Sequence, residues 1–365
     1  MLAESHPVIR MALRFAALPY CYLKLVNWDQ CTASRIQVLK DLFYIFFKLK
    51  YFPYNYSPCR LWEKTRKEWH FYYGSIYEPY QRSKLRREVQ KFEYIYLFDN
   101  KEISEIICRG IGISMPKYYG VVSPYMNYTE RIQGVVLNDK RKKLMIKPVM
   151  GQGGKGICLA YCNGTDIRVR VGKEEISLSD FNLKERSILQ EVVVQHKALS
   201  KIFPFCVNTI RYVTLLTKEE NVITLGSYIR FGIGNAYLDN VSAGGIEVGI
   251  DSASGKLRKI ALDKYGNKFE KHPTTNIKFE GIQIPYWDKV VELAKRVQQQ
   301  CSFLRLLGLD IAVLPDGPVL IEVNPNPDII GLEQVEGPLL KNRITYREFA
   351  KYDLFVNDFQ KKLYS

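Results

Sequence analysis

The chain has 365 residues, of which 47% are hydrophobic and 25% are charged. This composition is typical of a globular protein and excludes extended disorder, and the length predicts two or three domains. The formal net charge of +15 is compatible with nucleic acid, an anionic membrane or an anionic small substrate. Because the basic residues are dispersed and no recognition motif is present, we expect no nucleic-acid partner.

Eight cysteines are scattered along the chain without the spacing of a metal site or a CxxC motif. This use of cysteine is typical of a reducing compartment. No apolar run is long and uncharged enough to cross a bilayer. We therefore expect a cytoplasmic protein, with peripheral attachment to the cytoplasmic membrane face as a further option.

Residues 1–92 are rich in aromatic and basic side chains and are predicted to be mostly helical. Two interpretations of their apolar stripe stay open. The preferred one is a core face packed on the rest of the protein. The other is a basic amphipathic surface that contacts an inner-membrane surface or a partner such as a glycosyltransferase. The stripe consists of Ile36, Leu39, Phe43, Phe46 and Phe47.

Residues 93–195 are expected to form a first lobe with both helices and strands. A helix capped by Asp99 or Asn100 is predicted to end near Gly110. Strands are predicted over residues 118–122, 144–147, 157–161 and 188–194. A glycine loop lies between the second and third of these strands.

Residues 196–345 are expected to form a second, hairpin-rich lobe, and residues 346–365 a C-terminal helix. Strands are predicted over residues 209–216, 222–232, 244–251 and 256–262, and a last hairpin over 309–324. An amphipathic helix is predicted near residues 288–300, with Val290, Ala294, Val297 and Cys301 on one face.

The last hairpin carries the strongest candidate site. Strand residues alternate between faces, so Leu320, Glu322 and Asn324 are predicted to share one face. A turn at residues 316–317 would place Asp310 across from Glu322 to Asn324. These are hard oxygen donors of the kind that a phosphate-bound Mg²⁺ prefers. The alternative is that both carboxylates are solvated on an exposed face, but their flanks read as buried, where unpaired carboxylates are costly.

A glycine loop follows the predicted strand that ends at Lys147. Ordering Gly151, Gly153, Gly154 and Gly156 costs roughly 0.5–1 kcal/mol each in backbone entropy. Such loops occur where the backbone approaches a ligand closely, commonly a phosphate gripped by N–H groups. The loop fits neither a P-loop nor a dinucleotide-binding pattern, and an ordinary hairpin could hold the same glycines. Lys147 could reach a phosphate from the strand end.

Two further elements are weaker. The strand that contains Glu191 and Val193 could bring backbone N–H and C=O groups to an adenine edge, although a plain central strand explains it equally well. On the 209–232 hairpin, a symmetric turn places Arg211 opposite Tyr228 and brings Arg230 onto the same face. Like charges so close repel each other, so a shared anion such as a triphosphate or an acyl phosphate is expected between the arginines.

In this order, the elements resemble the ATP-grasp superfamily, and most closely its sugar-transfer-associated family, which is found with bacterial exopolysaccharide and capsule genes. The resemblance covers about residues 93–335. It implies an α+β fold in which two lobes with antiparallel sheets clamp ATP, after a mostly helical N-terminal region. The segments that carry it are Asn100-Lys101, KPVMGQGGKGI, LQEVVVQH, NTIRYVT, RFGIGNAYLDNVSAGGI and GLDIAVLPDGPVLIEVNPNPD.

The resemblance also implies a role for each matching residue. Lys101 and Lys147 would contact ATP phosphates beneath the glycine loop, and Glu191 and Val193 would meet adenine through their backbone. Arg230, and with it Arg211, would steady the transferred phosphate. The residues implied as Mg²⁺ ligands are Asp310, Glu322 and Asn324.

The function implied is that of an ATP-dependent carboxylate–amine ligase. A substrate carboxylate would attack the γ-phosphate, and an amine would then displace phosphate from the resulting acyl phosphate. The substrates expected are a small acid and an amine, one of them an anionic sugar or sugar precursor of surface polysaccharide biosynthesis. The alternative is a non-catalytic nucleotide-binding partner of a glycosyltransferase.

Overall fold

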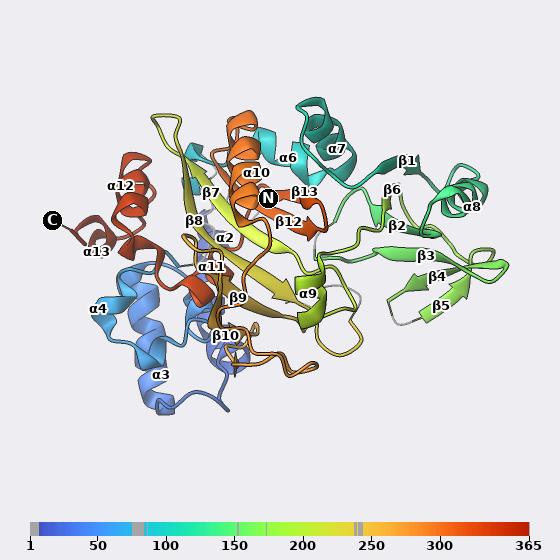
Figure 1. Cartoon of the computed structure of the whole chain (residues 1–365). Coiled ribbons are helices and arrows are strands. Elements are labelled where there is room, and N and C mark those ends of the chain that lie inside the picture. The colour runs from blue at the N-terminus through green and yellow to red at the C-terminus, as the bar shows by residue number, and fades with distance from the viewer. Residues whose placement is uncertain are drawn as a thin grey trace.

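The computed structural model describes residues 7–74, 84–85, 87–151, 153–172, 174–236, 239 and 244–364. Figure 1 shows a smaller sheet at one end of the molecule and a larger sheet in its centre, with helices on both faces of the larger one. The N-terminal helices lie on the side of the larger sheet that is remote from the smaller one. The expected α+β class, with two antiparallel sheets after a helical N-terminal region, is confirmed.

The smaller sheet has the strand order β1-β6-β2-β3-β4-β5. Its strands are β1 (Tyr118–Val122), β2 (Lys143–Pro148), β3 (Cys158–Asn163), β4 (Asp166–Val171), β5 (Glu174–Ser177) and β6 (Ser187–Glu191). Side chains alternate along β2, so Leu144 and Ile146 are buried in the core that α8 (Tyr128–Asn138) covers. Met145 and Lys147 therefore face the opposite side, which is left for a ligand.

The larger sheet has the order β11-β10-β9-β8-β7-β12-β13. Its strands are β7 (Ile210–Leu216), β8 (Val222–Phe231), β9 (Ile246–Ile250), β10 (Leu257–Leu262), β11 (Lys268–Phe269), β12 (Leu306–Leu314) and β13 (Gly317–Asn324). Every residue of β7 and β9 is buried, because helices cover both faces of the sheet.

One face of the larger sheet packs against α10 (Trp287–Gln300), whose predicted apolar face is buried in the main core. The other face packs against α11 (Ile329–Glu336) and α12 (Arg343–Lys351). The remaining helices of this half are α6 (Phe92–Asp99), α7 (Lys101–Gly110), α9 (Lys197–Ile202) and α13 (Asp358–Lys361). Asn100, one of the two predicted caps, accepts a hydrogen bond from Ile103 N at the start of α7.

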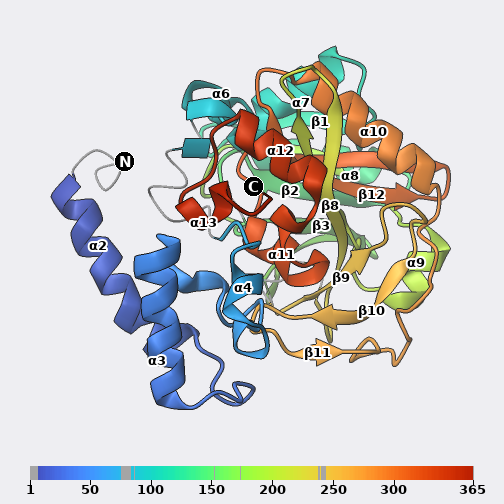
Figure 2. The same cartoon turned by 90° about the vertical axis from the view of Figure 1, so that its left-hand side faces the viewer.

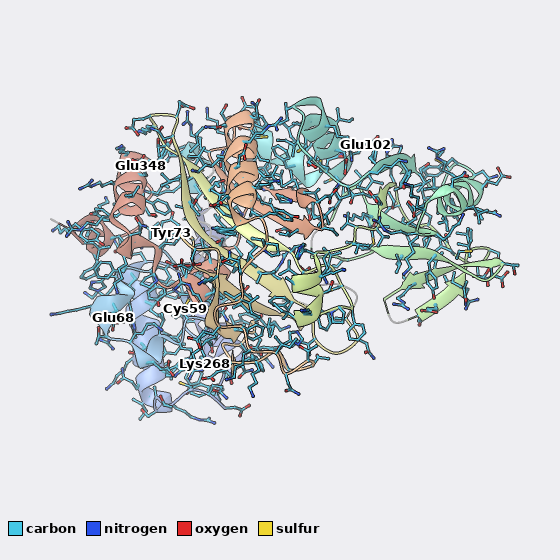
Figure 3. The ribbon with its side chains drawn as sticks, in the orientation of Figure 1. Cys59, Glu68, Tyr73, Glu102, Lys268 and Glu348 are labelled. Atoms are coloured by element: carbon cyan, nitrogen blue, oxygen red, sulfur yellow. The ribbon has the colours of Figure 1, made fainter. Side chains whose placement is uncertain are left out.

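The N-terminal region forms its own small core beside α11. Its helices are α2 (Pro7–Tyr20), α3 (Arg35–Tyr44) and α4 (Arg66–Trp69), with π-helical turns over Cys21–Leu25 and Ile45–Leu49. Figure 2 shows α2 and α3 side by side at the edge of the molecule. A buried carboxylate joins this region to α11, because Glu333 accepts hydrogen bonds from Tyr73 N at 2.7 Å and Gly74 N at 3.3 Å. In Figure 3, Tyr73 lies on the side of the larger sheet remote from the smaller one.

The preferred interpretation of the N-terminal apolar stripe is wrong for four of its five residues. Ile36 is 69% exposed, Leu39 and Phe43 are 45% exposed and Phe47 is 50% exposed, and Phe46 alone of the five is buried. The helix buries a different face, formed by Val38, Asp41 and Leu42. The periodicity was correct, but it could not show which of two adjacent stripes meets the core.

Most predicted strands and the 288–300 helix are confirmed to within a few residues, with some differences. The predicted 188–194 strand ends at Glu191, and the predicted C-terminal helix over 346–365 is divided between α12 and α13. A bulge after Asp310 pairs Ile311 with Leu320, so Leu320 joins the core instead of sharing the face of Glu322. The domain limits 1–92, 93–195, 196–345 and 346–365 stay a prediction. Across the described residues, no helix is long and apolar enough to cross a membrane.

Candidate active site

A cavity of about 450 Å³ lies between the two sheets and collects most of the predicted site residues. Its walls come from β2 and β6 of the smaller sheet, from β7, β8, β9, β12 and β13 of the larger one, and from the starts of α7 and α11. Gly151 and Gly156 do not line it. The predicted residues that do are Lys101, Lys147, Gly153, Gly154, Glu191, Val193, Arg211, Arg230, Asp310, Glu322 and Asn324.

The register of the larger sheet sets the charged residues in one row. Asp310 pairs across β12 and β13 with Glu322, and across β12 and β7 with Arg211. Arg211 in turn pairs with Tyr228 on β8, as predicted. Arg230 lies two residues further along β8, on the same face as Tyr228. Pairing of four strands thus concentrates these side chains on the cavity wall.

Asp310 is the anion that the two predicted arginines share. Arg211 Nε lies 2.7 Å from Asp310 Oδ1, and Arg230 Nη2 lies 3.0 Å from Asp310 Oδ2. Burial would raise the pKa of Asp310, but Arg211 and Arg230 outweigh it and hold the pKa below its ordinary value. The carboxylate is therefore charged, and it offsets the repulsion between the arginines that was expected to require a bound anion.

A second carboxylate supports Arg230 and was not predicted. Arg230 Nε donates to Thr209 Oγ1 at 3.1 Å and lies 3.7 Å from Asp239 Oδ2. Thr209 N also donates to Asp239 Oδ2, at 2.7 Å. Burial raises the pKa of Asp239, and Arg230 acts against this rise. Asp239 was not predicted because nothing local in the sequence indicates that it reaches an arginine on β8.

The two predicted lysines lie on the opposite wall. Lys101 Nζ donates to Gly151 O at 2.7 Å and lies 3.5 Å from Glu322 Oε1. Lys147 Nζ donates to Gln190 Oε1 at 2.5 Å. Burial lowers the pKa of Lys147, and Glu322 acts against this effect. Both ammonium groups thus lie close to the hairpin carboxylate of Glu322.

A buried glutamate outside the predicted set orients Lys147. Glu105 on α7 accepts a hydrogen bond from Gln190 Nε2 at 2.5 Å, and Gln190 in turn accepts from Lys147. Burial raises the pKa of Glu105, with Arg109 as the main opposing influence. Its position four residues after Lys101 on a helix is the only sequence signal that could have found it.

The end of β6 offers two backbone groups of different kinds. Glu191 N donates to Lys117 O at 2.8 Å, so this N–H is not available to a ligand. Val193 is buried and lines the cavity, and its N–H has no partner among the described residues. The side chain of Glu191 is held away by Arg141 at 2.6 Å. The edge of an adenine ring requires a donor such as the Val193 N–H, together with an acceptor such as the Glu191 carbonyl two residues before it.

The glycine loop joins β2 to β3 at the mouth of the cavity. Gly151, Gly153, Gly154 and Gly156 all have positive φ angles, between 69° and 123°. A Cβ at Gly156 would lie 2.8 Å from the Pro148 ring, so glycine is required there on steric grounds as well. Gln152 of the predicted motif lies outside the described residues. Gly153 and Gly154 line the cavity and can present their N–H groups to it.

A polar cluster that the sequence analysis did not single out lies deeper, beneath α11. Glu247 on β9 is 3% exposed and Tyr228 is 4% exposed, and both line the cavity with Asp328 and Gly331. Asp328 caps α11 by accepting a hydrogen bond from Ile330 N at 2.9 Å. The sequence did hold one signal for this cluster, because Glu247 is the lone charge in a strand whose other residues read as core.

A sequence profile decides the family. The profile described as sugar-transfer associated ATP-grasp matches residues 80–348 of this chain. The chain belongs to this ATP-grasp family. The search among curated proteins found no significant match.

Several solved structures resemble this ATP-grasp chain at low sequence identity. N5-carboxyaminoimidazole ribonucleotide synthetase from Thermotoga maritima has 12% identity and a TM-score of 0.40, over 76% of this chain and 52% of that chain. D-alanyl-alanine synthetase A from Vibrio cholerae has 11% identity and a TM-score of 0.41, over 73% and 65%. The ATP-grasp ligase PsnB, complexed with a minimal precursor variant, Mg and ADP, has 14% identity and a TM-score of 0.38, over 70% and 61%. The ATP-grasp chain described here thus spans 52% to 65% of the length of these three chains.

The ATP-grasp fold implies a magnesium ion, and the residues on β12 and β13 fit one. Glu322 is partly exposed to the cavity, and Asn324 Nδ2 is buried without a partner among the described residues. The Asn324 amide is thus free to turn its oxygen inward. Asp310 is engaged by two arginines: Oδ2 accepts from both Arg211 and Arg230, whereas Oδ1 accepts from Arg211 alone and keeps a lone pair. No group of three or more His, Cys, Asp or Glu suited to a metal occurs in the part of the chain described.

Proposed function

We propose that this protein is an ATP-dependent carboxylate–amine ligase that acts through an acyl phosphate. The observation that supports it most is the single cavity in which Lys101 and Lys147 face the arginine–aspartate row. Two cationic walls with hard oxygen donors between them suit a polyphosphate and a transferred phosphoryl group. No side-chain nucleophile is needed, because positioning and electrostatics supply most of the catalysis in phosphoryl transfer.

In this proposal, the nucleotide lies along the wall formed by β6 and β2. The Glu191 carbonyl would accept a hydrogen bond from the adenine amino group, and the Val193 N–H would donate to a ring nitrogen. Lys147 and Lys101 would bind phosphate oxygens, with Gly153 and Gly154 above them. Glu322 and Asn324, with Asp310, would hold Mg²⁺, which when bound supplies positive charge at the phosphate oxygens.

The arginines would then act on the charge that is transferred. The carboxylate of the acid attacks the γ-phosphorus, the bond to the β-phosphate oxygen breaks, and ADP leaves. Arg230 and Arg211 would bind the moving phosphoryl oxygens, exchanging part of their contact with Asp310 for contact with the phosphate. Because Asp310 and Asp239 fix both guanidinium groups beforehand, little reorganisation is required.

The substrates are proposed to be a small acid and an amine, with an anionic sugar or sugar precursor as one of them. The net charge of +15 supports an anionic substrate. The description of the family as sugar-transfer associated supports a role in the synthesis of bacterial surface polysaccharide. We place this activity in the cytoplasm.

The exposed N-terminal stripe supports contact with the cytoplasmic membrane face. Phe43 and Phe47 are stacked with ring centroids 5.7 Å apart, and Phe15 lies 6.4 Å from Phe47. Exposed lysines, including Lys40 and Lys48, flank them. Apolar rings beside basic side chains are what an anionic lipid surface binds. The same surface supports the second candidate function, a non-catalytic nucleotide-binding partner of a glycosyltransferase.

The deciding experiment is a screen of the purified protein with Mg-ATP, uronic acids and amino acids, in which hydroxylamine replaces the amine. We expect ADP, phosphate and an acyl hydroxamate of the matching mass with at least one acid. Glu322→Ala is expected to lower the rate of hydroxamate formation by about 100-fold or more. ADP binding without hydroxamate from any acid, in a protein that still binds a glycosyltransferase, would instead support the second candidate.

A further inference from the structure

Three oxygen atoms from three elements converge at the inner end of the cavity. The place where a Cβ of residue 331 would sit is 3.2 Å from Asp328 Oδ2, 3.3 Å from the Tyr228 hydroxyl and 3.5 Å from Glu247 Oε1. Gly331 lies in the first turn of α11, and its missing side chain keeps this place open. Tyr228, Glu247 and Asp328 all line the cavity, so a ligand can approach the three oxygens from it.

The polar groups of Tyr228 and Glu247 line the cavity without a partner among the described residues. Within the described residues, neither the Tyr228 hydroxyl nor the Glu247 carboxylate has a hydrogen-bond or ion-pair partner, although both side chains are more than nine-tenths buried and line the cavity. Arg230 is the cross-strand neighbour of Glu247, but its guanidinium is engaged by Asp310 and Thr209. A buried carboxylate without a partner is costly, so a bound group that completes it is the natural explanation.

The inner end lies on the same sheet face as the phosphate-binding row. Glu247 pairs with Arg230 across β8 and β9, and Tyr228 pairs with Arg211 across β7 and β8. A group seated between Glu247 and Tyr228 is therefore one strand away from the arginines. In the proposed reaction, the second substrate must bind at such a position, next to the phosphoryl group that is transferred.

We propose that Glu247, Tyr228 and Asp328 form the binding site for the nitrogen of the amine co-substrate, a primary amine that arrives as an ammonium ion. This inference rests on the proposed function and adds to it the residues that select the nucleophile. Two carboxylates and a hydroxyl around one point suit the three N–H donors of an ammonium group and offer nothing to an anion. The cavity thus has a cationic phosphate end, at Lys101, Lys147, Arg211 and Arg230, and an anionic amine end, at Glu247, Tyr228 and Asp328.

The second half of the reaction follows from this placement. The nitrogen forms a bond to the acyl carbon, the bond from that carbon to the phosphate oxygen breaks, and phosphate leaves with the electron pair. Two protons leave the nitrogen. One goes to the Glu247 carboxylate as the ammonium becomes a nucleophile, and the other leaves with the phosphate. Glu247 is thus a catalytic base as well as a binding group.

The electrostatics of Glu247 agree with such a role. Burial, reinforced by Asp328 and by Asp263, raises the pKa of Glu247 well above its ordinary value, and Arg230 and Arg211 act in the opposite direction. An entering ammonium ion favours the charged carboxylate and so acts against the rise in pKa that burial causes.

The test separates the two half-reactions. Hydroxylamine is largely uncharged at neutral pH and traps the acyl phosphate without an ammonium site, so hydroxamate formation reports the first half alone. Amide formation with ethanolamine, glucosamine or lysine, read by product mass, reports both halves. The variants are Glu247→Gln, which removes the charge, and Gly331→Ala, which fills the pocket. Gly134→Ala on α8, where a Cβ meets nothing within 4 Å, is the matched control for glycine replacement in a helix.

We expect both variants to raise the KM for the amine, or to slow amide formation, by about tenfold or more, and to affect hydroxamate formation and the thermal shift with Mg-ADP much less than amide formation. Gly134→Ala should change neither reaction. Amide formation at wild-type rates in both variants would overturn the inference. So would a parallel loss of hydroxamate and amide, because the residues would then serve the first half-reaction. If the wild type forms no hydroxamate with any acid, the proposed ligase function itself fails, and the inference with it.

Discussion

The two ends of the cavity treat buried charge in opposite ways. At the phosphate end, Asp310 lies within 3.0 Å of both Arg211 and Arg230, and the lysines are engaged by Glu322 and Gln190. At the amine end, Glu247 has no partner among the described residues. The comparison shows which charges the fold neutralises itself and which it leaves for a ligand. Paired charges can be fixed before ATP arrives, whereas an unpaired carboxylate gains its partner from the substrate.

The largest effect is expected at Asp310, which holds the paired charges of the phosphate end together. Asp310→Ala leaves two buried guanidinium groups without their anion, and we expect the free energy of unfolding to fall by about 3–5 kcal/mol. Chemical denaturation monitored by fluorescence would measure the change, with Asp316→Ala, in the exposed turn of the same hairpin, as control. A loss below about 1 kcal/mol would show that the arginine–aspartate row is not a stability element.

The next largest effect is expected at Glu322, whose removal should act on turnover. Its side chain is partly exposed and lies 3.5 Å from Lys101, so Glu322→Ala costs little stability. The rate of ATP-dependent hydroxamate formation should fall by about 100-fold or more, because the phosphate oxygens lose a metal ligand. Excess Mg²⁺ or Mn²⁺ should restore part of the rate. Unchanged turnover at limiting Mg²⁺ would exclude Glu322 as a ligand.

A smaller effect, on ATP affinity, is expected at Lys147 of the phosphate end. Lys147→Met keeps much of the side-chain volume but removes the charge, and we expect ATP affinity to fall by about tenfold, since one charge-assisted contact to phosphate is lost. Isothermal titration with a non-hydrolysable ATP analogue would measure this. AMP or adenosine, which lack the outer phosphates, should bind the variant and the wild type more nearly alike. An equal loss of affinity for adenosine would place Lys147 elsewhere.

The smallest effect is expected at the amine end, and its sign is opposite to that at Asp310. The pKa of Glu247 is raised in the folded protein, so its contribution to stability is full below the unfolded-state pKa and is lost as pH rises through the folded value. Glu247→Gln does not titrate, and it should therefore gain stability relative to the wild type between pH 5 and pH 8, on the order of 1 kcal/mol. Denaturation curves at the two pH values would show it. A difference in stability between the variant and the wild type that is the same at both pH values would contradict the raised pKa.

Period-two alternation was enough to predict the wall that carries Asp310 and Glu322, because both lie on one hairpin whose turn fixes the register. It could not predict that Asp310 binds Arg211, since β7 and β12 are neighbours in space but are separated by almost a hundred residues. Leu320 was misplaced for a local reason. A bulge adds one residue to the strand and reverses the faces beyond it.

The amine end and the N-terminal stripe were harder to predict for other physical reasons. Glu247 is a charged residue in a buried strand, but only the packing of α11 brings Gly331 and Asp328 over it. For the stripe at Phe43 and Phe47, helical spacing identified an apolar face without showing whether protein or solvent covers it. The sequence can indicate amphipathicity, whereas burial depends on which neighbour is present.

The hydrogen bonds of Glu333 connect α11, the helix over the amine end, to the N-terminal region. This carboxylate lies two residues after Gly331 on α11, and it takes donors from Tyr73 and Gly74 as well as from Leu339 at 3.1 Å. Tyr73 and Gly74 precede residue 80, where the family profile begins. A chain shortened to that span would lose two of these three donors to α11. If Glu247, Tyr228 and Asp328 bind the amine as proposed, variation in the segment before residue 80 would therefore retune the choice of amine while every residue of the cavity wall stays the same.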